Sequence, residues 1–196
     1  LFVITIAVPQ FVSLLLMCNF LNDNGPFNGL LQSLHLIQHP IPFLSDPVWA
    51  KFSIILVNMW IGIPFTMLVA TGIIMNLPSE QIEAAEIDGA SKLQIFKSIT
   101  FPQILLIMAP SLIQQFIGNI NNFNVIYFLT GGGPTNSSYY QAGSTDLLVT
   151  WLYKLTVSAK DYNLASVIGI LIFAISAAFS LLAYTRSASF KEGTAK

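Results

Sequence analysis

Four long apolar runs constrain this chain more than any other feature of its sequence. A helix needs about 20 mainly apolar residues to cross the hydrocarbon core of a bilayer, and runs of that length cover 1–21, 53–75, 104–129 and 164–185. In soluble domains about a quarter of the residues are charged, whereas here 9% are charged and 54% are hydrophobic. The sequence therefore predicts an all-α, polytopic membrane protein with four spans in one transmembrane domain, 1–196.

The first apolar run begins at Leu1 itself, without a methionine or a polar segment before it. We therefore expect further residues to precede Leu1 in the complete protein. A secretory signal would carry a positive flank and a small-residue cleavage site, and this run has neither. The only cysteine of the chain, Cys18, indicates nothing about the redox compartment.

Basic residues between the runs predict which side of the membrane each loop faces, because they are enriched in cytoplasmic loops. The loop 76–103 and the C-terminal tail together carry five of them, Lys92, Lys97, Arg186, Lys191 and Lys196, and the opposite side carries three, Lys51, Lys154 and Lys160. We therefore expect 76–103 and the C-terminus to be cytoplasmic and the loops 22–52 and 130–163 to be extracytoplasmic. The second outer loop is expected to form a turn and then a helix, with Asp146 and Asp161 solvated.

The one charge-dense stretch of the chain is EQIEAAEIDGASKLQIFKSITFP, residues 80–102, in the loop that we expect to be cytoplasmic. Gly89 can end a helix in the left-handed conformation, and Ser91 with Gln94 forms the S-x-x-Q pattern of a capping box. The stretch thus predicts two helices joined by a tight turn, at about 78–101, with the second helix stopping near Pro102. On these residues alone, a solvated connection between spans stays open as the alternative.

The spacing within this stretch resembles the EAA motif of ABC-importer membrane subunits. The matching positions are Glu83, Ala84, Ala85, Gly89, Ile99 and Pro102. The segments GPFNGLLQSL, NNFNVIYFLTGGGP and AGSTDLLVTWLYKL extend the resemblance to the carbohydrate-uptake branch, and most of all to the larger membrane subunit of maltose/maltodextrin importers (MalF type). The resemblance implies the core of a type I ABC-importer transmembrane domain, in the cell membrane of a bacterium or archaeon. Because family members carry further spans before this region, it also implies N-terminal spans that precede Leu1.

The resemblance also implies a transporter subunit rather than an enzyme. Two cytoplasmic ATPase subunits would bind ATP and Mg²⁺, so that this chain itself would need no cofactor. The helices at about 78–101 would be coupling helices that seat in a groove of the ATPase, with Glu83 pairing with a basic residue there. A second homologous permease subunit and an extracytoplasmic sugar-binding protein, docked on the loops 22–52 and 130–163, would complete an importer that works by alternating access.

Amides are the candidate substrate groups, because the four predicted spans contain no Asp, Glu, Lys, Arg or His. Carboxamides both donate and accept hydrogen bonds, which suits sugar hydroxyls, and an aromatic face can cover a pyranose ring. On the residues alone, however, such amides more often bond to neighbouring helices. The resemblance implies that a sugar site is lined by Gln10, Asn58, Ile61, Gly62, Phe65, Asn119 and Asn122.

Two other patterns predict no site. His35 and His39 have the i, i+4 spacing of metal ligands, but Pro40 follows directly and a third ligand is not evident. Gly131–Gly133 lack the Lys and Ser/Thr of a phosphate-binding loop and indicate a turn. The net charge of −1 gives no reason to expect nucleic acid as a partner.

The sequence therefore predicts a permease subunit that imports maltose or maltodextrin-type oligosaccharides. Another sugar or polyol is the nearest alternative substrate. An ion-coupled carrier or channel is a more distant one, because such proteins usually need charged groups within their spans. A non-transporting membrane scaffold that recruits a soluble ATPase is the third alternative.

Overall fold

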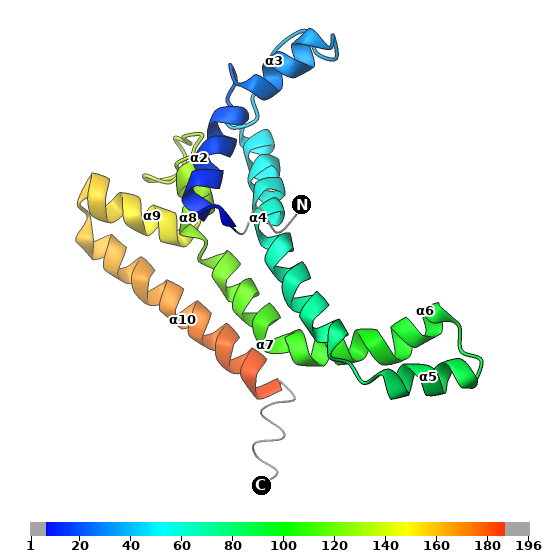
Figure 1. The fold of residues 1–196 in the computed structure, drawn as a ribbon. Coiled ribbons are helices and arrows are strands. Elements are labelled where there is room, and N and C mark those ends of the chain that lie inside the picture. Colours follow the sequence, from blue (N-terminus) through cyan, green and yellow to red (C-terminus); the bar gives the residue numbers. More distant parts are fainter. Residues whose placement is uncertain (1–6, 187–196) are drawn as a thin grey trace. The chain divides into compact units, whose positions relative to one another are not determined.

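The computed structural model describes residues 7–186, and the regular structure in that range is helical (Figure 1). The elements are α2 (Gln10–Phe20), α3 (Pro26–Ser33), α4 (Pro47–Met75), α5 (Ser79–Ile87), α6 (Lys92–Ile95), η1 (Phe96–Thr100), α7 (Phe101–Ile120), α8 (Phe123–Leu129), α9 (Leu148–Lys154), η2 (Leu155–Ala159) and α10 (Tyr162–Arg186). The predicted all-α class is confirmed. The chain forms two compact units: unit 1, Leu1–Pro64 with Gly118–Ser176, and unit 2, Phe65–Ile117 with Ala177–Lys196.

Three helices among the described residues are long and apolar enough to cross a membrane: Pro47–Met75, Lys92–Ile120 and Tyr162–Ala183. The expected first span, 1–21, lies partly outside the described residues, and its described part forms α2, an apolar helix of 11 residues. The tail residues Lys191 and Lys196, which contributed to the predicted sidedness, also lie outside.

The helix α4 begins where the sequence supplies a cap. The Asp46 side chain accepts hydrogen bonds from the backbone N–H groups of Val48, at 2.9 Å, and Trp49, at 3.0 Å. It therefore satisfies two donors that the first turn of a helix leaves unpaired. Pro47 occupies the first helical position, where its missing N–H costs nothing.

The expected span 104–129 is not one helix. α7 ends at Ile120 and α8 begins at Phe123, with Asn121 and Asn122 between them. The Asn122 side chain accepts a hydrogen bond from the backbone N–H of Val125 at 3.3 Å and so caps α8. Because an asparagine can satisfy the unpaired donors of a new helix start, these amides allow the chain to break here.

The predicted helix stop near Pro102 is wrong, since α6, η1 and α7 follow one another without interruption as the apolar helix Lys92–Ile120. Proline lacks an N–H group and its ring crowds the preceding turn of a regular α-helix. Just before Pro102 the helix widens into the π segment η1, and the N–H of Phe101 donates to the carbonyl of Phe96. This local change of hydrogen-bond register lets the helix continue through the proline.

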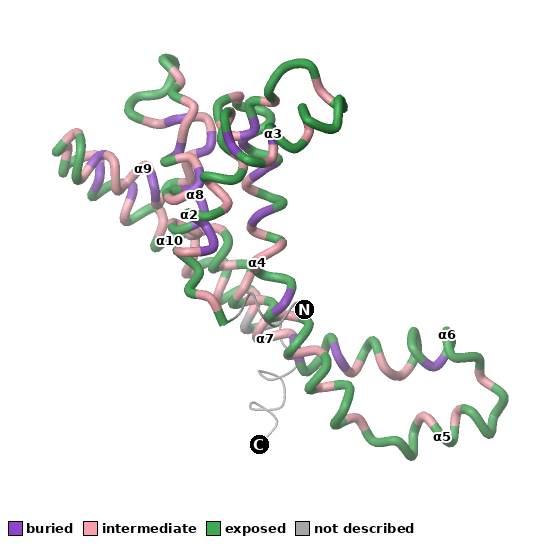
Figure 2. The backbone as a smooth tube through the Cα atoms, turned by 45° about the horizontal axis from the view of Figure 1, so that its top comes forward, coloured by how far each residue is buried: buried purple, intermediate pink, exposed green. Residues whose placement is uncertain are grey.

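Unit 1 contains two buried apolar clusters. The first joins α2, α4 and α8 through Leu14, Val57, Val125 and Leu129, and the second joins η2 to α10 through Leu155, Ala165 and Ile168. Figure 2 shows buried positions on α4, α8 and α9. These clusters hold α8 to α2 and α4, and η2 with the adjoining α9 to α10.

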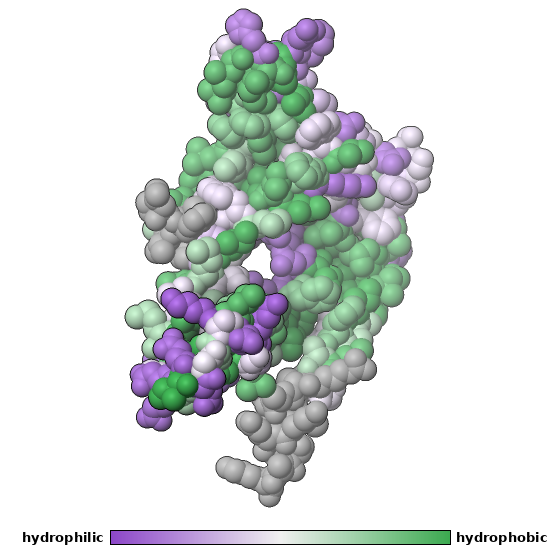
Figure 3. Space-filling view, turned by 90° about the vertical axis from the view of Figure 1, so that its right-hand side faces the viewer, coloured by the Kyte–Doolittle hydropathy of each residue, from purple (hydrophilic) through white to green (hydrophobic). Residues whose placement is uncertain are grey.

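Unit 2 carries the hairpin of α5 and α6. No residue of α5 is buried (Figure 2), and hydrophilic side chains gather on the hairpin surface in Figure 3. A hydrogen bond of 2.5 Å from Nε2 of Gln103 to Oε1 of Gln81 ties α5 to α7. The hairpin is therefore fixed at its base and exposed along its length.

Candidate functional site

The turn of the α5–α6 hairpin follows the local signals of the sequence. Gly89 has φ +80°, and the N–H of Ala90 donates to the carbonyl of Ala85 at 3.0 Å, as in a Schellman-type helix end. Ser91 and Gln94 form the predicted capping box: Ser91 N–H donates to Gln94 Oε1 at 2.8 Å, and Gln94 N–H to Ser91 Oγ at 3.4 Å. The predicted left-handed glycine and capping box are both confirmed.

Three residues of the EAA-like motif line a hollow of the hairpin, and the other three do not. A cavity of about 360 Å³ lies between α5 and the α6–η1 segment, and its lining includes Ala85, Gly89 and Ile99. Glu83, Ala84 and Pro102 are exposed. The hairpin also exposes large apolar side chains, with Ile87 87% exposed and Leu93 63% exposed. A polar surface with exposed apolar side chains and a hollow at its turn is suited to contact with another protein.

Three of the predicted substrate residues form a hydrogen-bonded amide cluster in unit 1. Asn58 of α4 donates from Nδ2 to Oδ1 of Asn119 at 2.9 Å, and Nδ2 of Asn122 donates to Oδ1 of Asn58 at 3.0 Å. We call Asn58, Asn119 and Asn122 the amide cluster. Each carboxamide offers two N–H donors and an oxygen with two lone pairs, so these bonds occupy only part of its capacity.

Open space adjoins this part of unit 1. A Cβ atom built on Gly62, one turn after Asn58, or on Gly118, next to Asn119, would meet nothing within 4 Å apart from its own helix backbone and chain neighbours. Asn119 is exposed, while Asn58 and Asn122 are half-buried. The cluster is thus partly accessible on the surface of unit 1, through Asn119.

The other predicted sugar residues lie in different surroundings. Ile61 is half-buried and packs against the apolar cluster of Leu14, Val57, Val125 and Leu129. Gln10 is the exposed first residue of α2. Phe65 is 50% exposed and is the first residue of unit 2.

Sequence reasoning missed several polar contacts. Thr66 Oγ1 donates to Gln115 Oε1 at 3.0 Å within unit 2. The Asp161 side chain, expected to be solvated, accepts from the N–H of Leu164 at 3.2 Å and caps α10. An aspartate directly before a long apolar run is a recognised start signal for a helix, so this cap was detectable in the sequence.

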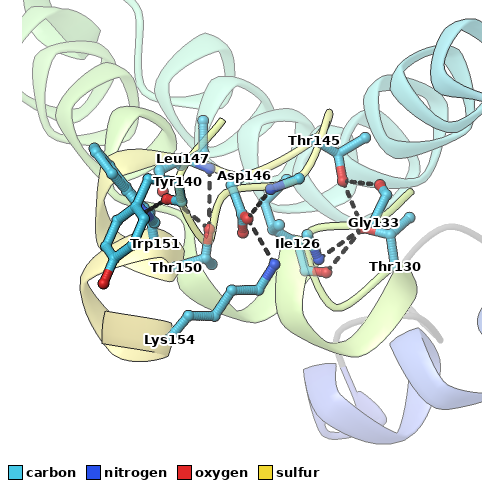
Figure 4. Close-up of polar contacts among 12 residues, drawn as sticks. Ile126, Thr130, Gly133, Tyr140, Thr145, Asp146, Leu147, Thr150, Trp151 and Lys154 are labelled. Carbon is cyan, nitrogen blue, oxygen red and sulfur yellow. Dashed lines mark hydrogen bonds and ion pairs between the residues drawn. The ribbon is translucent and has the colours of Figure 1, made fainter. Parts of the chain in front are cut away.

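The prediction of a solvated Asp146 is wrong, because only 2% of its side chain is exposed. Its Oδ2 atom accepts hydrogen bonds from Lys154 Nζ at 2.6 Å and from the backbone N–H of Gly143 at 2.7 Å (Figure 4). The loop folds back so that Thr135 pairs with Gly143 in an isolated antiparallel bridge. The burial therefore results from tertiary folding of the loop, for which the local sequence gives no signal.

Comparison with known proteins places this geometry in a family. Residues 1–189 match the family model described as "Binding-protein-dependent transport system inner membrane component". The chain is 40% identical over 189 residues to the galactooligosaccharides transport system permease protein GanP of Bacillus subtilis (strain 168), covering 95% of this chain and 44% of that protein. It is 39% identical over 191 residues to the maltodextrin transport system permease protein MdxF of the same strain, covering 94% and 44%.

A maltose/maltodextrin transport system permease protein MalF, of Vibrio parahaemolyticus serotype O3:K6 (strain RIMD 2210633), is 38% identical over 187 residues, covering 93% of this chain and 35% of that protein. The chain thus spans less than half the length of these curated relatives.

Solved structures agree with this assignment. A bacterial ABC transporter involved in the import of the acidic polysaccharide alginate contains a chain with a TM-score of 0.76 and 25% identity, covering 90% of this chain and 59% of that one. A second alginate transporter structure, in complex with an alginate pentasaccharide-bound periplasmic protein, gives a TM-score of 0.77. The expected resemblance to sugar ABC-importer permeases is confirmed. This chain, with its apolar spanning helices, belongs to the family of binding-protein-dependent transport system inner membrane components.

Proposed function

We propose that this chain is the core of a permease subunit that imports neutral oligosaccharides of the maltodextrin type. The observation that carries the proposal is the amide cluster beside open space at Gly62 and Gly118. Its relatives include permeases named for maltodextrin transport, which are 37 and 39% identical. They also include one named for galactooligosaccharide transport, which is 40% identical. Galactooligosaccharides are therefore the second candidate substrate.

Charge favours a neutral sugar. The amide cluster offers donors and acceptors without net charge, and a hydroxylated ring binds such groups without a counter-ion. An acidic polysaccharide, as in the alginate transporters of similar fold, would gain more from a cationic site. A bound sugar would exchange its hydroxyls for the bonds that the asparagines now make to one another.

The α5–α6 hairpin is proposed to couple this site to ATP hydrolysis. In this proposal the hairpin lies in the cytoplasm, where two ATPase subunits bind ATP and Mg²⁺. Glu83 meets a basic residue of the ATPase, and the exposed Ile87 and Leu93 contribute apolar contact. Because Gly89 and the capping box fix the turn, closure of the ATPase pair would displace the hairpin as one body and switch the spans between inward-facing and outward-facing states.

The outer side is proposed to meet a soluble sugar-binding protein through the loops 22–52 and 130–163. The relevant support is the alginate transporter that was solved together with its sugar-loaded periplasmic protein. A second, homologous permease subunit would complete the path. It would cover apolar surface of the three long helices, in whose apolar stretches only 11 to 17% of the residues are buried within the described part of this chain.

Uptake by the reconstituted importer tests the proposal. The full-length permease, its partner permease, the ATPase and the binding protein are placed in liposomes with internal ATP, and radiolabelled maltotriose, a galactotriose and an alginate trisaccharide are supplied outside. We expect ATP-dependent uptake of maltotriose and little uptake of the alginate fragment. Faster uptake of galactotriose would move the substrate to the second candidate. Uptake driven by an ion gradient without ATP would overturn the importer mechanism.

A further inference from the structure

We propose that Asp146 and Lys154 are positioning residues for the outer loop. Their buried ion pair holds the loop 131–147 against α8 and α9, so that its tip, Asn136–Gln141, is a preformed docking surface for the sugar-loaded binding protein. This inference rests on the proposed function, in which the loop lies outside and a soluble protein delivers the sugar.

The base of the loop is closed by hydroxyl and backbone contacts. Thr130 and Thr145 share a hydrogen bond of 2.8 Å between their Oγ1 atoms, and Thr145 Oγ1 also donates to the carbonyl of Gly133 (Figure 4). Backbone bonds add to this closure: Thr145 N–H donates to the Gly132 carbonyl at 3.3 Å, and Ser144 N–H to the Pro134 carbonyl at 2.9 Å. The two ends of the loop are therefore held side by side.

The ion pair secures this closed base to α9. The side chains of Asp146 and Lys154 are 2% and 25% exposed, and their charged atoms lie 2.6 Å apart. Removal of one partner from such a pair leaves a buried charge without compensation, which strongly disfavours the closed arrangement. Thr150, which bonds to the N–H of Leu147 at 2.9 Å, fixes the start of α9 next to it.

Gly132 explains why the pair can form. It has φ +81°, and a Cβ atom there would overlap the Asp146 carboxylate and the Lys154 ammonium group. The glycine run that precedes Pro134 therefore has a use beyond the turn itself. It lets the backbone pass directly over the ion pair.

The tip is exposed although its base is fixed. Tyr139 and Tyr140 are 57% and 59% exposed, while the carbonyl of Tyr140 accepts a hydrogen bond from Trp151 Nε1 at 2.8 Å. The tip sequence, NSSYYQ, is uncharged. Tyrosine is enriched at protein–protein interfaces, and antibody binding loops combine it with serine and asparagine. A preformed surface avoids the entropic loss of ordering a loop on binding.

The helices that flank the loop have contacts of their own. Phe123 and Tyr127 of α8 pack against Tyr153 of α9, with ring centroids 5.1 and 5.2 Å apart. Leu155 is buried against Ala165 and Ile168 of α10. Loss of the ion pair should therefore free the loop and leave the helices in place.

ATPase stimulation by the binding protein tests this inference in the complete importer. The half-saturating concentration of sugar-loaded binding protein and the maximal rate are measured for Lys154→Met and for the tip variant Tyr139→Ser/Tyr140→Ser. We expect each to raise the half-saturating concentration about tenfold while the maximal rate stays within about twofold, as when an interface must be ordered on binding. The two changes combined should add little to either alone, because they act on the same surface.

The controls separate positioning from simple structural damage. Lys154→Arg keeps the charge and should stay near wild type. Lys160→Asn removes an exposed basic residue between η2 and α10, outside the loop 131–147. Its position is left-handed, φ 55°, which asparagine tolerates, and this variant should also stay near wild type. If Lys154→Met fails to assemble, Asp146→Asn/Lys154→Met removes both charges together and is used in its place.

Three results would overturn the inference. The first is an unchanged half-saturating concentration in the Lys154 variant or in the tip variant. The second is a lower maximal rate without a change in half-saturation, which would mark the ion pair as purely structural. The third is a wild-type importer that does not respond to the binding protein at all, which would overturn the proposed function as well.

Discussion

The two polar clusters of unit 1 use different chemistry. The amide cluster is uncharged, has an exposed member in Asn119 and adjoins open space. The pair of Asp146 and Lys154 is charged, and its carboxylate is almost fully buried. Amides can exchange one hydrogen-bond partner for another at small net free-energy change, whereas a buried charge that loses its partner is strongly destabilised. The first cluster is suited to transient ligands, and the second to a fixed structure.

Within unit 1, the largest effect is expected from removal of the amide cluster. Asn119→Ala with Asn122→Ser should lower maltotriose uptake on the order of a hundredfold, as for two lost hydrogen bonds to substrate of about 1.4 kcal/mol each. Serine at 122 is a good N-cap and keeps α8 capped. Uptake is measured in liposomes with the assembled importer.

Asn121→Ala is the matched control for this double variant. Asn121 is the neighbouring asparagine, and its Nδ2 donates to Ser176 Oγ at 2.9 Å on α10. Its loss should leave uptake within about twofold, since a single interhelical bond in a membrane protein averages roughly 0.6 kcal/mol. Equal loss of uptake in control and double variant would assign all these amides to packing.

A second effect is expected from Gly132→Ala. Alanine must adopt a positive φ and would also push against Asp146 and Lys154, so we expect the assembled complex to lose about 2 kcal/mol or more of stability. Thermal melting of the purified complex measures it. Gly131→Ala has φ +58° but meets nothing within 4 Å, so only the backbone strain of about 1 kcal/mol should remain. Equal losses of stability in Gly132→Ala and Gly131→Ala would show that the ion pair does not depend on the close approach of the Gly132 backbone.

A third, smaller effect is expected when the open space at Gly62 is filled. Gly62→Val should lower uptake roughly tenfold, because its side chain occupies room that a sugar would use, worth about 1.4 kcal/mol. Gly72→Val lies on the same helix, where an added Cβ also meets nothing within 4 Å. This control should import sugar at close to the wild-type rate. If Gly62→Val and Gly72→Val import sugar at the same rate, the space at Gly62 holds no sugar.

The smallest effect concerns a cap outside both clusters. Asp161→Ala removes the acceptor for Leu164 N–H at the start of α10, which should destabilise the complex by about 1 kcal/mol. Asp161→Asn keeps a good cap and should restore the melting temperature. An unchanged melting temperature in the alanine variant would mean that another group satisfies this helix start.

Local signals account for what the sequence predicted. Gly89, Ser91 and Gln94 act within one turn of the chain, and the structure confirms them. The asparagines were recognisable because amides within apolar runs must find partners. Their mutual bonds across 61 and 64 residues are the contacts between helices that the residues alone favour.

Tertiary folding accounts for what the sequence did not predict. Asp146 and Lys154 are eight residues apart, and their pairing needs the loop to fold back over Gly132. The helix break at Asn122 depends on a cap that competes with continued helix. The passage through Pro102 depends on the π segment before it, and no simple periodicity marks such a segment.

The central claim is that this permease core moves a neutral sugar because its α5–α6 hairpin transmits the closing motion of the ATPase pair to the spans. The most direct test is maltotriose uptake and ATP hydrolysis by the same liposomes carrying Glu83→Lys, with Glu86→Lys as the control, since both glutamates are exposed on α5. We predict that Glu83→Lys abolishes uptake while the complex still assembles, and that Glu86→Lys imports sugar. Uptake at the wild-type rate in Glu83→Lys would contradict the account.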